Sequence, residues 1–332
     1  MENILLIRLK SIGDVLFTLP AVHVVRENFP DDKLHFLISK EHAPLLRGFR
    51  EINEVIPFDR AALSSGNPFR QLPELSHLLR RLRTGSFSLV VDFQGYGETA
   101  WLAWFTGAPQ RWGSVYGPGR AWAYTLGIRR DNALHLAEWN LSLLEQCGLN
   151  IGAVKNEFIL PEDALDAARK FFSDQKLDAS KPTLFIQPFT SSPQKDWPLE
   201  NFLELARHFR ARGVQILFGG GPSERDLLEL ARLGAFVVAA GEPLLVSAGL
   251  AKLSTLVLSA DTGLPHLAVA MGKRVVMLIH SIAPGANHPF RHPDWTVTAP
   301  PGESVKAIQI PVVIAAVEQA LAELNATSGN SL

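Results

Sequence analysis

Short apolar runs alternate with longer amphipathic stretches along the whole chain, and no other feature of the sequence constrains the fold as strongly. The apolar runs cover residues 4–9, 34–39, 89–93, 183–187, 214–218, 236–239, 256–259 and 274–279. Such runs are typical of parallel strands that are covered on both faces. The stretches between them include candidate helices at residues 15–27, 198–212, 223–233 and 264–271. This alternation predicts an α/β fold with open, doubly wound sheets.

The alternation pauses between residues 150 and 182. An amphipathic helix that starts near Pro161 and ends near Gln175 lies in the pause, followed by a polar stretch. Because 332 residues are too many for one compact core, we expect two domains, residues 1–160 and 161–332. The second should end in a helix over residues 305–324. In open α/β sheets ligands bind beyond the carboxyl ends of the strands, so we expect the site in strand-to-helix loops that face a cleft between the domains.

Charge and composition exclude several classes of protein. The 32 Lys and Arg residues balance 33 Asp and Glu, which gives no overall attraction to nucleic acid. The single cysteine, Cys147, excludes an internal disulfide framework and any multi-cysteine metal site. The first residues do not resemble a signal peptide, and no uncharged apolar stretch reaches the roughly 18 residues that a membrane span needs. These features predict a soluble, cytoplasmic protein.

The first candidate loop, Lys10-Ser11-Ile12-Gly13-Asp14, follows the first predicted strand. Gly13 permits a tight turn, and Asp14 falls at the start of the next helix. Asp14 is therefore either a helix cap or a carboxylate that takes a proton from a substrate hydroxyl. Both interpretations remain open at this stage.

Three further loops follow strands of the second half. The loop at residues 187–198 offers the hydroxyls of Thr190 and Ser191 together with Lys195, which suit a phosphate or simply form a polar turn. Three glycines at residues 219–221 precede Glu224, which could accept hydrogen bonds from ribose hydroxyls, unless the glycines only form a turn. Asp261-Thr262-Gly263-Leu264-Pro265-His266 ends a strand and opens a helix, so its free N–H groups predict a diphosphate site.

Other chemistries are excluded by missing residues. Residues 95–100 fit G-x-G-x-x-A, but residues 99–130 contain no Asp or Glu to hold an NAD ribose. No D-x-D pair is present to hold a cation, and no acid arrangement completes a metal site with His280, His288 and His292. We therefore expect no metal and no cofactor.

Two basic stretches can each be interpreted as purely structural or as functional. The acid-free residues 99–130 combine Arg120 and other arginines with tryptophans and tyrosines, which suits a sugar or phosphate-bearing acceptor or a helix core with a basic rim. Residues 70–83 place four arginines beside leucines. That pattern favours an ordinary amphipathic surface helix, although contact with an anionic membrane surface is also open.

Taken together, the loops resemble those of the bacterial heptosyltransferases of lipopolysaccharide core assembly, glycosyltransferase family 9. The resemblance covers nearly the whole chain, and its motifs occur in the same order. They are residues 7–21 with Ser11-Ile12-Gly13-Asp14, Asp92-Phe93-Gln94-Gly95, Lys195-Asp196-Trp197-Pro198, Gly221 with Glu224, and residues 261–266.

This resemblance implies a GT-B architecture, in which two Rossmann-like domains bind the acceptor mainly on the first and the nucleotide sugar mainly on the second. It implies inverting, metal-independent transfer of heptose from ADP-heptose to the inner core of a lipid A-linked oligosaccharide, at the inner face of the cytoplasmic membrane. By motif, Asp14 would be the general base. The acceptor side would include Ser11, Gly13, Gln94 and Arg120. The donor side would include Thr190, Ser191, Lys195, Glu224, Asp261, Thr262, Gly263 and His266.

The chain departs from the family pattern after residues 274–279, where members often have Gly-x-Thr-x-Pro. Here the sequence is His280-Ser281-Ile282-Ala283-Pro284-Gly285, in a loop that should border the donor site. Two other functions remain open: a nucleotide-sugar epimerase or hydrolase of the same fold, and a non-catalytic protein that binds nucleotide sugars.

Overall fold

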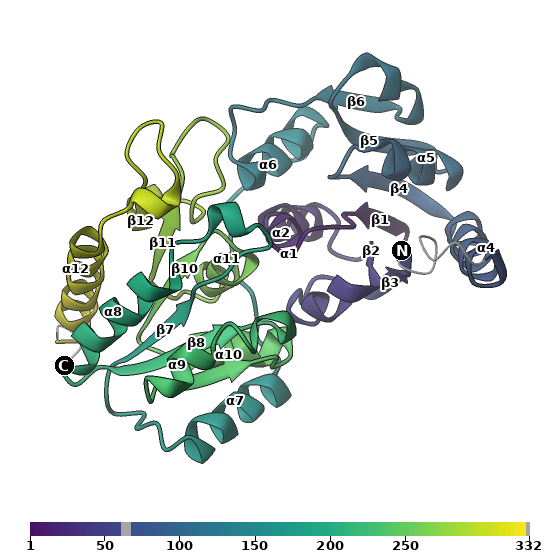
Figure 1. Ribbon diagram of the computed structural model, residues 1–332. Helices are drawn as coiled ribbons and strands as arrows, with labels where there is room; N and C mark the ends of the chain where they lie inside the picture. Colours follow the sequence, from purple (N-terminus) through teal and green to yellow (C-terminus); the bar gives the residue numbers. More distant parts are fainter. Residues whose placement is uncertain (61–67, 330–332) are drawn as a thin grey trace. The chain divides into compact units, whose positions relative to one another are not determined.

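The computed structural model describes residues 1–60 and 68–329 (Figure 1). The chain forms two compact units, Met1–Ile159 and Leu160–Leu332, and each contains one six-stranded sheet. All neighbouring strands in both sheets pair in parallel. Helices flank the sheets, which confirms the predicted α/β class. No helix in the described part of the chain is both long enough and apolar enough to span a bilayer.

The sheet of the first unit has the order β3-β2-β1-β4-β5-β6. Its strands are β1 (Asn3–Ile7), β2 (Lys33–Ser39), β3 (Glu54–Phe58), β4 (Phe87–Asp92), β5 (Gln110–Val115) and β6 (Leu126–Arg129). Its helical segments include α1 (Ile12–Leu16), α2 (Leu19–Asn28), η1 (Lys40–Gly48), α4 (Pro68–Thr84), α5 (Gly97–Phe105), η2 (Pro118–Ala123) and α6 (Leu136–Gln146). Strand order reverses between β1 and β4, and such switch points are where open α/β sheets bind ligands.

The sheet of the second unit has the order β12-β11-β10-β7-β8-β9 and reverses between β7 and β10. Its strands are β7 (Thr183–Gln187), β8 (Gln215–Gly220), β9 (Val237–Ala240), β10 (Leu256–Ala260), β11 (Val275–Ile279) and β12 (Thr296–Thr298). Its α-helices are α7 (Glu162–Asp174), α8 (Leu199–Arg210), α9 (Glu229–Leu233), α10 (Leu244–Leu253), α11 (Gly263–Ala270) and α12 (Ile310–Gly329). Short 3₁₀ helices are η3 (Pro193–Lys195), η4 (Pro222–Glu224), η5 (Pro293–Trp295) and η6 (Val305–Ala307).

Two apolar layers hold the second sheet between its helices. Leu184 and Ile186 of β7 pack in one layer with residues of α8 and α12, such as Phe209 and Val317. Phe185 between them packs in the opposite layer with residues of α7, α10 and α11. Because successive strand side chains point to opposite faces, one apolar run supplies both layers. This is the reason that the central strands are apolar throughout.

Four strands do not follow from apolar runs in the sequence. β3, β6 and β12 are edge strands with partly exposed side chains, so they lack a continuous run. β5 is internal, but it contains Gly113 and Ser114 where a longer side chain would clash or lose a partner. A Cβ at Gly113 would lie 2.2 Å from the Tyr124 ring, and the Ser114 hydroxyl accepts a 3.0 Å hydrogen bond from the Trp139 indole.

Helices predicted over residues 161–175, 198–212 and 264–271 are confirmed as α7, α8 and α11. The single helix expected over residues 15–27 is wrong, because Thr18 separates α1 from α2 and turns its hydroxyl to the carbonyl of Val15 at 2.7 Å. Over residues 223–233 only α9 is an α-helix, after η4. The last helix starts later than expected, at Ile310, with Pro311 in its first turn.

Candidate functional site

Arg8 and Asp14 form an ion pair directly beyond the carboxyl end of β1. Arg8 is only 3% exposed, and its guanidinium also donates to the carbonyls of Lys10 at 3.0 Å and Phe93 at 3.1 Å. Asp14 lies in α1, where its Oδ2 accepts the Arg8 bond and a longer 3.3 Å bond from the Ser11 N–H. Within the described part of the chain, the hydrogen bonds to Asp14 all end on Oδ2. The side chain is 28% exposed, so Oδ1 is left for a ligand.

The loop after β4 lies beside this pair, across the switch point of the sheet. Gln94 is fully buried, and its Oε1 accepts a 2.9 Å bond from the Leu9 N–H. Its Nε2 is buried and has no hydrogen-bond partner among the described residues. A buried amide nitrogen without a partner is costly and uncommon in native structures. It therefore marks this loop as a place where a partner is missing.

Asp92 fixes the conformation of the loop after β4. Its Oδ1 accepts bonds from the N–H groups of Gln94 at 2.9 Å and Gly95 at 3.0 Å, and its Oδ2 accepts the Tyr124 hydroxyl at 2.7 Å. Burial raises the pKa of Asp92, and these hydrogen bonds oppose the shift. Gly95 is required because its φ is +68° and a Cβ there would lie 2.0 Å from the Ser114 carbonyl oxygen. We infer that Asp92 positions Gln94 and is not itself exposed to a substrate.

Two arginines complete this end of the first sheet. Arg120 donates to the Gly95 carbonyl at 3.1 Å. Arg130, which follows β6, stacks on the buried Trp139 with its guanidinium carbon 5.2 Å from the ring centroid. Its Nε and Nη1 are buried without a hydrogen-bond partner in the described residues. Burial lowers the pKa of Arg130, and the nearby charges of Arg8 and Asp14 affect it in opposite directions.

In the second unit, Lys195 and His266 converge on Asp261 at the start of α11. The Lys195 ammonium lies 3.4 Å from Asp261 Oδ2, and His266 Nε2 lies 3.9 Å from Oδ1. Burial alone would raise the pKa of Asp261, but His266 and the Lys195 ammonium outweigh it, and the pKa lies below its usual range. Thr262 caps the helix, since its hydroxyl accepts a 3.2 Å bond from the Leu264 N–H. Lys195 remains 60% exposed and is accessible to an anion.

The loop after β7 is closed by its own polar groups. The Thr190 N–H donates to Asp196 at 2.8 Å, and the Thr190 hydroxyl bonds to the backbone of Ser192. Ser191 is exposed. Because β7 and β10 are neighbours, this loop and the start of α11 lie on the two sides of the switch point.

Glu224 lies after β8, the neighbour of β7 on its other side. Its Oε2 accepts a 2.8 Å bond from the Gly221 N–H and a weak 3.5 Å bond from Gln187. Burial raises the pKa of Glu224, and the charge of Asp196 adds to that effect. Of the three glycines, Gly219 and Gly220 belong to β8, and only Gly221 lies beyond it.

The structure thus places Ser11, Gly13, Asp14 and Gln94 beside the switch point of the first sheet, and Lys195, Asp261 and His266 beside that of the second, whereas Arg120 and Glu224 follow the next strands, β5 and β8. Arg8, Asp92, Tyr124 and Arg130 lie in motifs or stretches that the sequence singles out, but no role followed for them from sequence; in the structure they hold or surround the expected acceptor residues. A charged residue inside an apolar run, as Arg8 is, could have signalled a buried pair. Of the basic stretch at residues 70–83, the described part forms α4 with Leu78 and Leu82 buried, which fits the amphipathic surface helix.

The histidine loop after β11 has no metal-like arrangement. His280 and Ser281 are exposed, and His292 stacks on Trp295 with ring centroids 3.7 Å apart. Among the described residues, no three His, Cys, Asp or Glu side chains are grouped so that they could hold a metal ion.

Two parallel Rossmann-like sheets with polar loops at their switch points are typical of the GT-B architecture. The sequence model of glycosyltransferase family 9 (heptosyltransferase) matches residues 75–305, and the chain belongs to this family. The lipopolysaccharide core heptosyltransferase OpsX of Haemophilus influenzae is 23% identical over 90% of this chain and 84% of its own length.

Solved structures show the same fold. A family 9 glycosyl transferase from Veillonella parvula has a TM-score of 0.86 and 22% identity, and the match covers 97% of each chain. The heptosyltransferase WaaC of E. coli, solved with ADP, has a TM-score of 0.78 and 21% identity, over 96% of this chain and 99% of that chain. The protein is therefore a glycosyltransferase, and these matches do not favour the epimerase, hydrolase or non-catalytic alternatives.

Proposed function

We propose that this protein transfers a heptose from ADP-heptose to the inner core of lipopolysaccharide, with inversion at the anomeric carbon and without a metal ion. The observation that carries the catalytic part of this proposal is the Arg8–Asp14 pair, which engages one carboxylate oxygen and leaves the other accessible. Family membership and the names of the relatives support the choice of donor and acceptor.

On the acceptor side, Asp14 accepts the proton of the attacking hydroxyl on Oδ1. The freed oxygen attacks the anomeric carbon from the face opposite the diphosphate, the new glycosidic bond forms, and ADP leaves with the electrons of the broken bond. Arg8 holds Asp14 in orientation through its Oδ2 without taking part in proton transfer. Gln94 Nε2 and Arg120 are the nearby donors that would hold the acceptor hydroxyls, beside the Ser11–Gly13 turn.

On the donor side, Lys195 and the N–H groups of Thr262 and Gly263 bind the diphosphate. Charge develops on the leaving phosphate in the transition state, and fixed donors aimed at it substitute for a divalent cation. Asp261, which His266 contacts through its other carboxylate oxygen, holds the Lys195 ammonium at the helix start. Thr190 and Ser191 add hydroxyl donors, and Glu224 accepts hydrogen bonds from the ribose.

The acceptor is attached to lipid A, so we also propose that the enzyme works at the cytoplasmic face of the inner membrane. The test of the whole proposal is incubation of the purified protein with ADP-heptose and a heptose-free inner-core acceptor. Mass spectrometry should show the acceptor gaining one heptose, and NMR of the product should show inverted anomeric configuration. Consumption of ADP-heptose without any acceptor would favour a hydrolase or epimerase, and ADP binding without transfer would favour a binding protein.

A further inference from the structure

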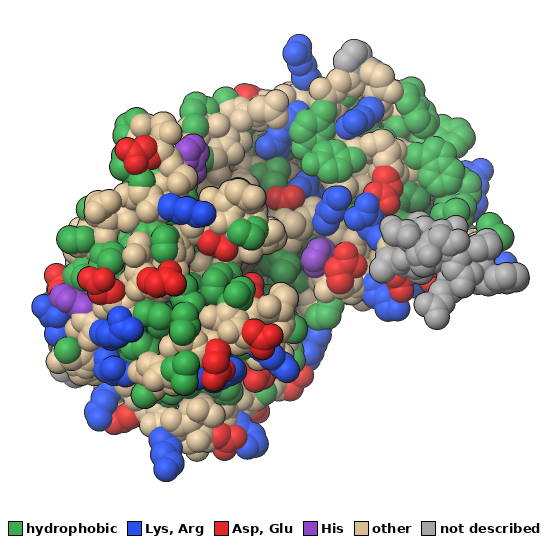
Figure 2. Space-filling view, in the orientation of Figure 1, with side chains coloured by type: hydrophobic (Ala, Val, Ile, Leu, Met, Phe, Trp, Pro, Cys, Tyr) green, Lys and Arg blue, Asp and Glu red, His purple; other side chains and the backbone are tan. Residues whose placement is uncertain are grey.

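One face of the first unit exposes large aromatic side chains. Trp101, Trp104 and Trp122 are 38%, 47% and 57% exposed, whereas Trp112, Trp139 and Trp197 are at most 8% exposed. Trp101 and Trp104 lie on one side of α5, and Trp122 belongs to η2. Figure 2 shows hydrophobic side chains gathered over this end of the unit.

These side chains form one connected surface. Trp101 stacks on Phe105 with ring centroids 5.2 Å apart, and Trp104 meets Trp122 edge to face at 5.7 Å. Residues three and four apart on a helix share a face, so Trp101, Trp104 and Phe105 are neighbours. We call Trp101, Trp104, Phe105 and Trp122 the aromatic face. Contiguous exposed apolar surface of this kind marks an interaction site.

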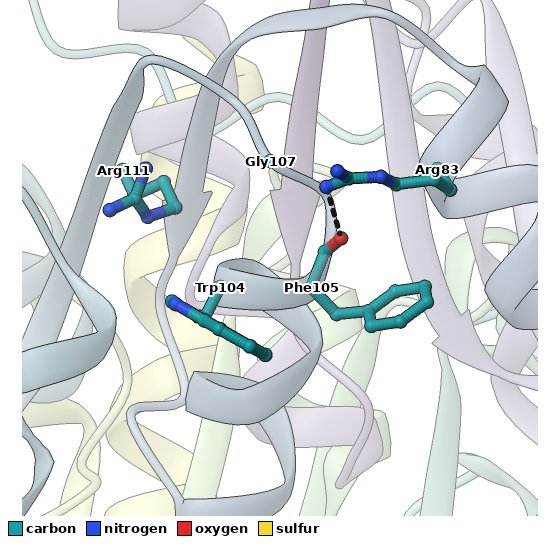
Figure 3. Close-up of a pocket in the computed structure, with 5 residues that line it drawn as sticks. All are labelled: Arg83, Trp104, Phe105, Gly107 and Arg111. Atoms are coloured by element: carbon teal, nitrogen blue, oxygen red, sulfur yellow. Dashed lines mark hydrogen bonds between the residues drawn. The ribbon is translucent and has the colours of Figure 1, made fainter.

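A basic pocket of about 420 Å³ adjoins the aromatic face (Figure 3). Its lining residues are Arg83, Trp104, Phe105, Gly107 and Arg111. Arg83 donates to the Phe105 carbonyl at 3.3 Å, and Arg111 donates to the carbonyls of Ala108 and Ala123. Both guanidinium groups are therefore held by backbone carbonyls in the pocket that Trp104 also lines.

The backbone around the pocket is built for this arrangement. Gly107 has a φ of +72°, and a Cβ there would lie 2.2 Å from Arg83 Nη1. Only glycine lets the Arg83 guanidinium approach the chain at this point without strain. In addition, residues 99–130 contain no Asp or Glu, so this segment brings no negative charge of its own to the surface.

We propose that the aromatic face docks on an anionic phospholipid bilayer, with the indoles in the interfacial layer and Arg83 and Arg111 at lipid phosphates. Trp is enriched at membrane–water interfaces because its ring is apolar and its N–H is polar. Arginine binds phosphate through its planar fork, and basic side chains are attracted to anionic lipid. The inference rests on the proposed function in one respect: a lipid-linked acceptor gives the enzyme a reason to work at a membrane.

The test measures binding of the full chain to vesicles of phosphatidylglycerol and phosphatidylethanolamine, with phosphatidylcholine vesicles for comparison. The wild type should bind the anionic vesicles more tightly. The double variant W104A/W122A should lose at least about tenfold in binding, as expected for removing two partly buried aromatic side chains. Arg83→Ala should lose about fivefold, and this loss should disappear at high salt. Matched controls are L227A/L230A, exposed by 53% and 50% in the second unit, and Arg207→Ala, which is exposed on α8.

Two further measurements distinguish docking on a lipid bilayer from binding of a second copy of the chain. Brominated phosphatidylglycerol should quench the fluorescence of the wild type and quench the triple variant W101F/W104F/W122F much less, because the tryptophans that remain in it lie outside the aromatic face. Equal vesicle binding by W104A/W122A and its control overturns the proposal. So does concentration-dependent dimerisation that the same variant abolishes, since the face would then bind a second copy.

Assays with an acceptor that lacks acyl chains distinguish failure of the docking proposal from failure of the proposed function. W104A/W122A should transfer to that acceptor at the wild-type rate, while losing rate on the lipid-linked acceptor in vesicles. Vesicle binding without any transfer by the wild type would contradict the proposed function and leave the docking surface intact.

Discussion

Asp14 is bound to Arg8 through only one of its two carboxylate oxygens. Oδ2 receives the guanidinium and the Ser11 N–H, and the guanidinium is itself held by the carbonyls of Lys10 and Phe93. The carboxylate is thereby oriented by a residue that is almost fully buried. Ser11 is the N-cap of α1, and Asp14 contributes to the cap from the third helical position by accepting the Ser11 N–H, although at 3.3 Å this bond is long. The cap and the proposed general base therefore use different oxygens of the same side chain.

Asp14→Asn should reduce the rate of heptose transfer by about a hundred- to ten-thousand-fold, because general-base assistance is typically worth that much. The amide keeps the shape of the side chain and can still accept the Ser11 N–H. Steady-state kinetics with an inner-core acceptor gives the rate, and calorimetry should show unchanged ADP affinity. A fall of less than about tenfold would mean that Asp14 is only a cap.

Arg8→Met should destabilise the fold by about 1–3 kcal/mol, because it leaves the carboxylate and two carbonyls without their charged donor. In an Asp14→Asn background the same substitution should be less harmful. A double-mutant cycle from chemical denaturation should give a coupling of about 0.5–3 kcal/mol, the range for residues in direct contact. Additive effects of the two substitutions would show that the pair is energetically unimportant.

Lys195→Ala should weaken ADP binding and lower kcat, since a charge-assisted contact to the diphosphate is worth about 1.5–3 kcal/mol, or roughly ten- to 150-fold. The loss should appear in kcat because the contact strengthens as charge builds on the leaving group. Lys181→Ala is a matched control: Lys181 is 62% exposed and lies 3.7 Å from Asp178, much as Lys195 is 60% exposed and lies 3.4 Å from Asp261. Equal behaviour of the two variants would remove Lys195 from the donor site.

Glu224→Gln should weaken ADP binding. In the ligand-free protein, its stability relative to the wild type should be higher at pH 7.5 than at pH 4. Burial raises the pKa of Glu224, so the native state holds its proton more tightly than the unfolded chain. As pH rises above the usual glutamate range, the unfolded chain ionises first and the stability of the wild type falls. The glutamine variant has no such charge to bury and can still accept the Gly221 N–H. Thermal unfolding of both proteins at the two pH values checks this, and a difference in melting temperature that does not change with pH would contradict it.

Transfer should continue in EDTA, because Lys195 and the start of α11 are proposed to carry the diphosphate charge. The assay compares the initial rate in chelator with the rates after adding magnesium or manganese. Loss of activity that a divalent cation restores would refute the metal-independent mechanism.

The parallel core strands were predictable from sequence because burial on both faces demands continuous apolar runs. β7 has the predicted bounds, and β10 and β11 differ by one residue. The edge strands β3, β6 and β12 were not predictable in this way, although the edge strand β9 was, since an edge strand needs only one partner strand and tolerates polar side chains. Thr18 likewise breaks the expected helix through a hydrogen bond of its hydroxyl, which apolar periodicity does not contain.

The same distinction between local sequence signals and tertiary structure applies to the candidate site. The sequence by itself determined which loops are candidates for the site, because local signals place Asp14, Lys195, Glu224 and the Asp261–His266 segment after apolar strands. Only the tertiary structure decided that Arg8 turns inward onto Asp14 and that Gln94 reaches Leu9 with its other amide atom unpartnered. It also separated the buried Trp112 and Trp139 from the exposed Trp104 and Trp122. The physical reason is that the burial of a side chain and its choice of hydrogen-bond partner depend on strands that neighbour each other in the sheet but lie far apart in the chain. Leu9 and Gln94, which follow the neighbouring strands β1 and β4, are 85 residues apart.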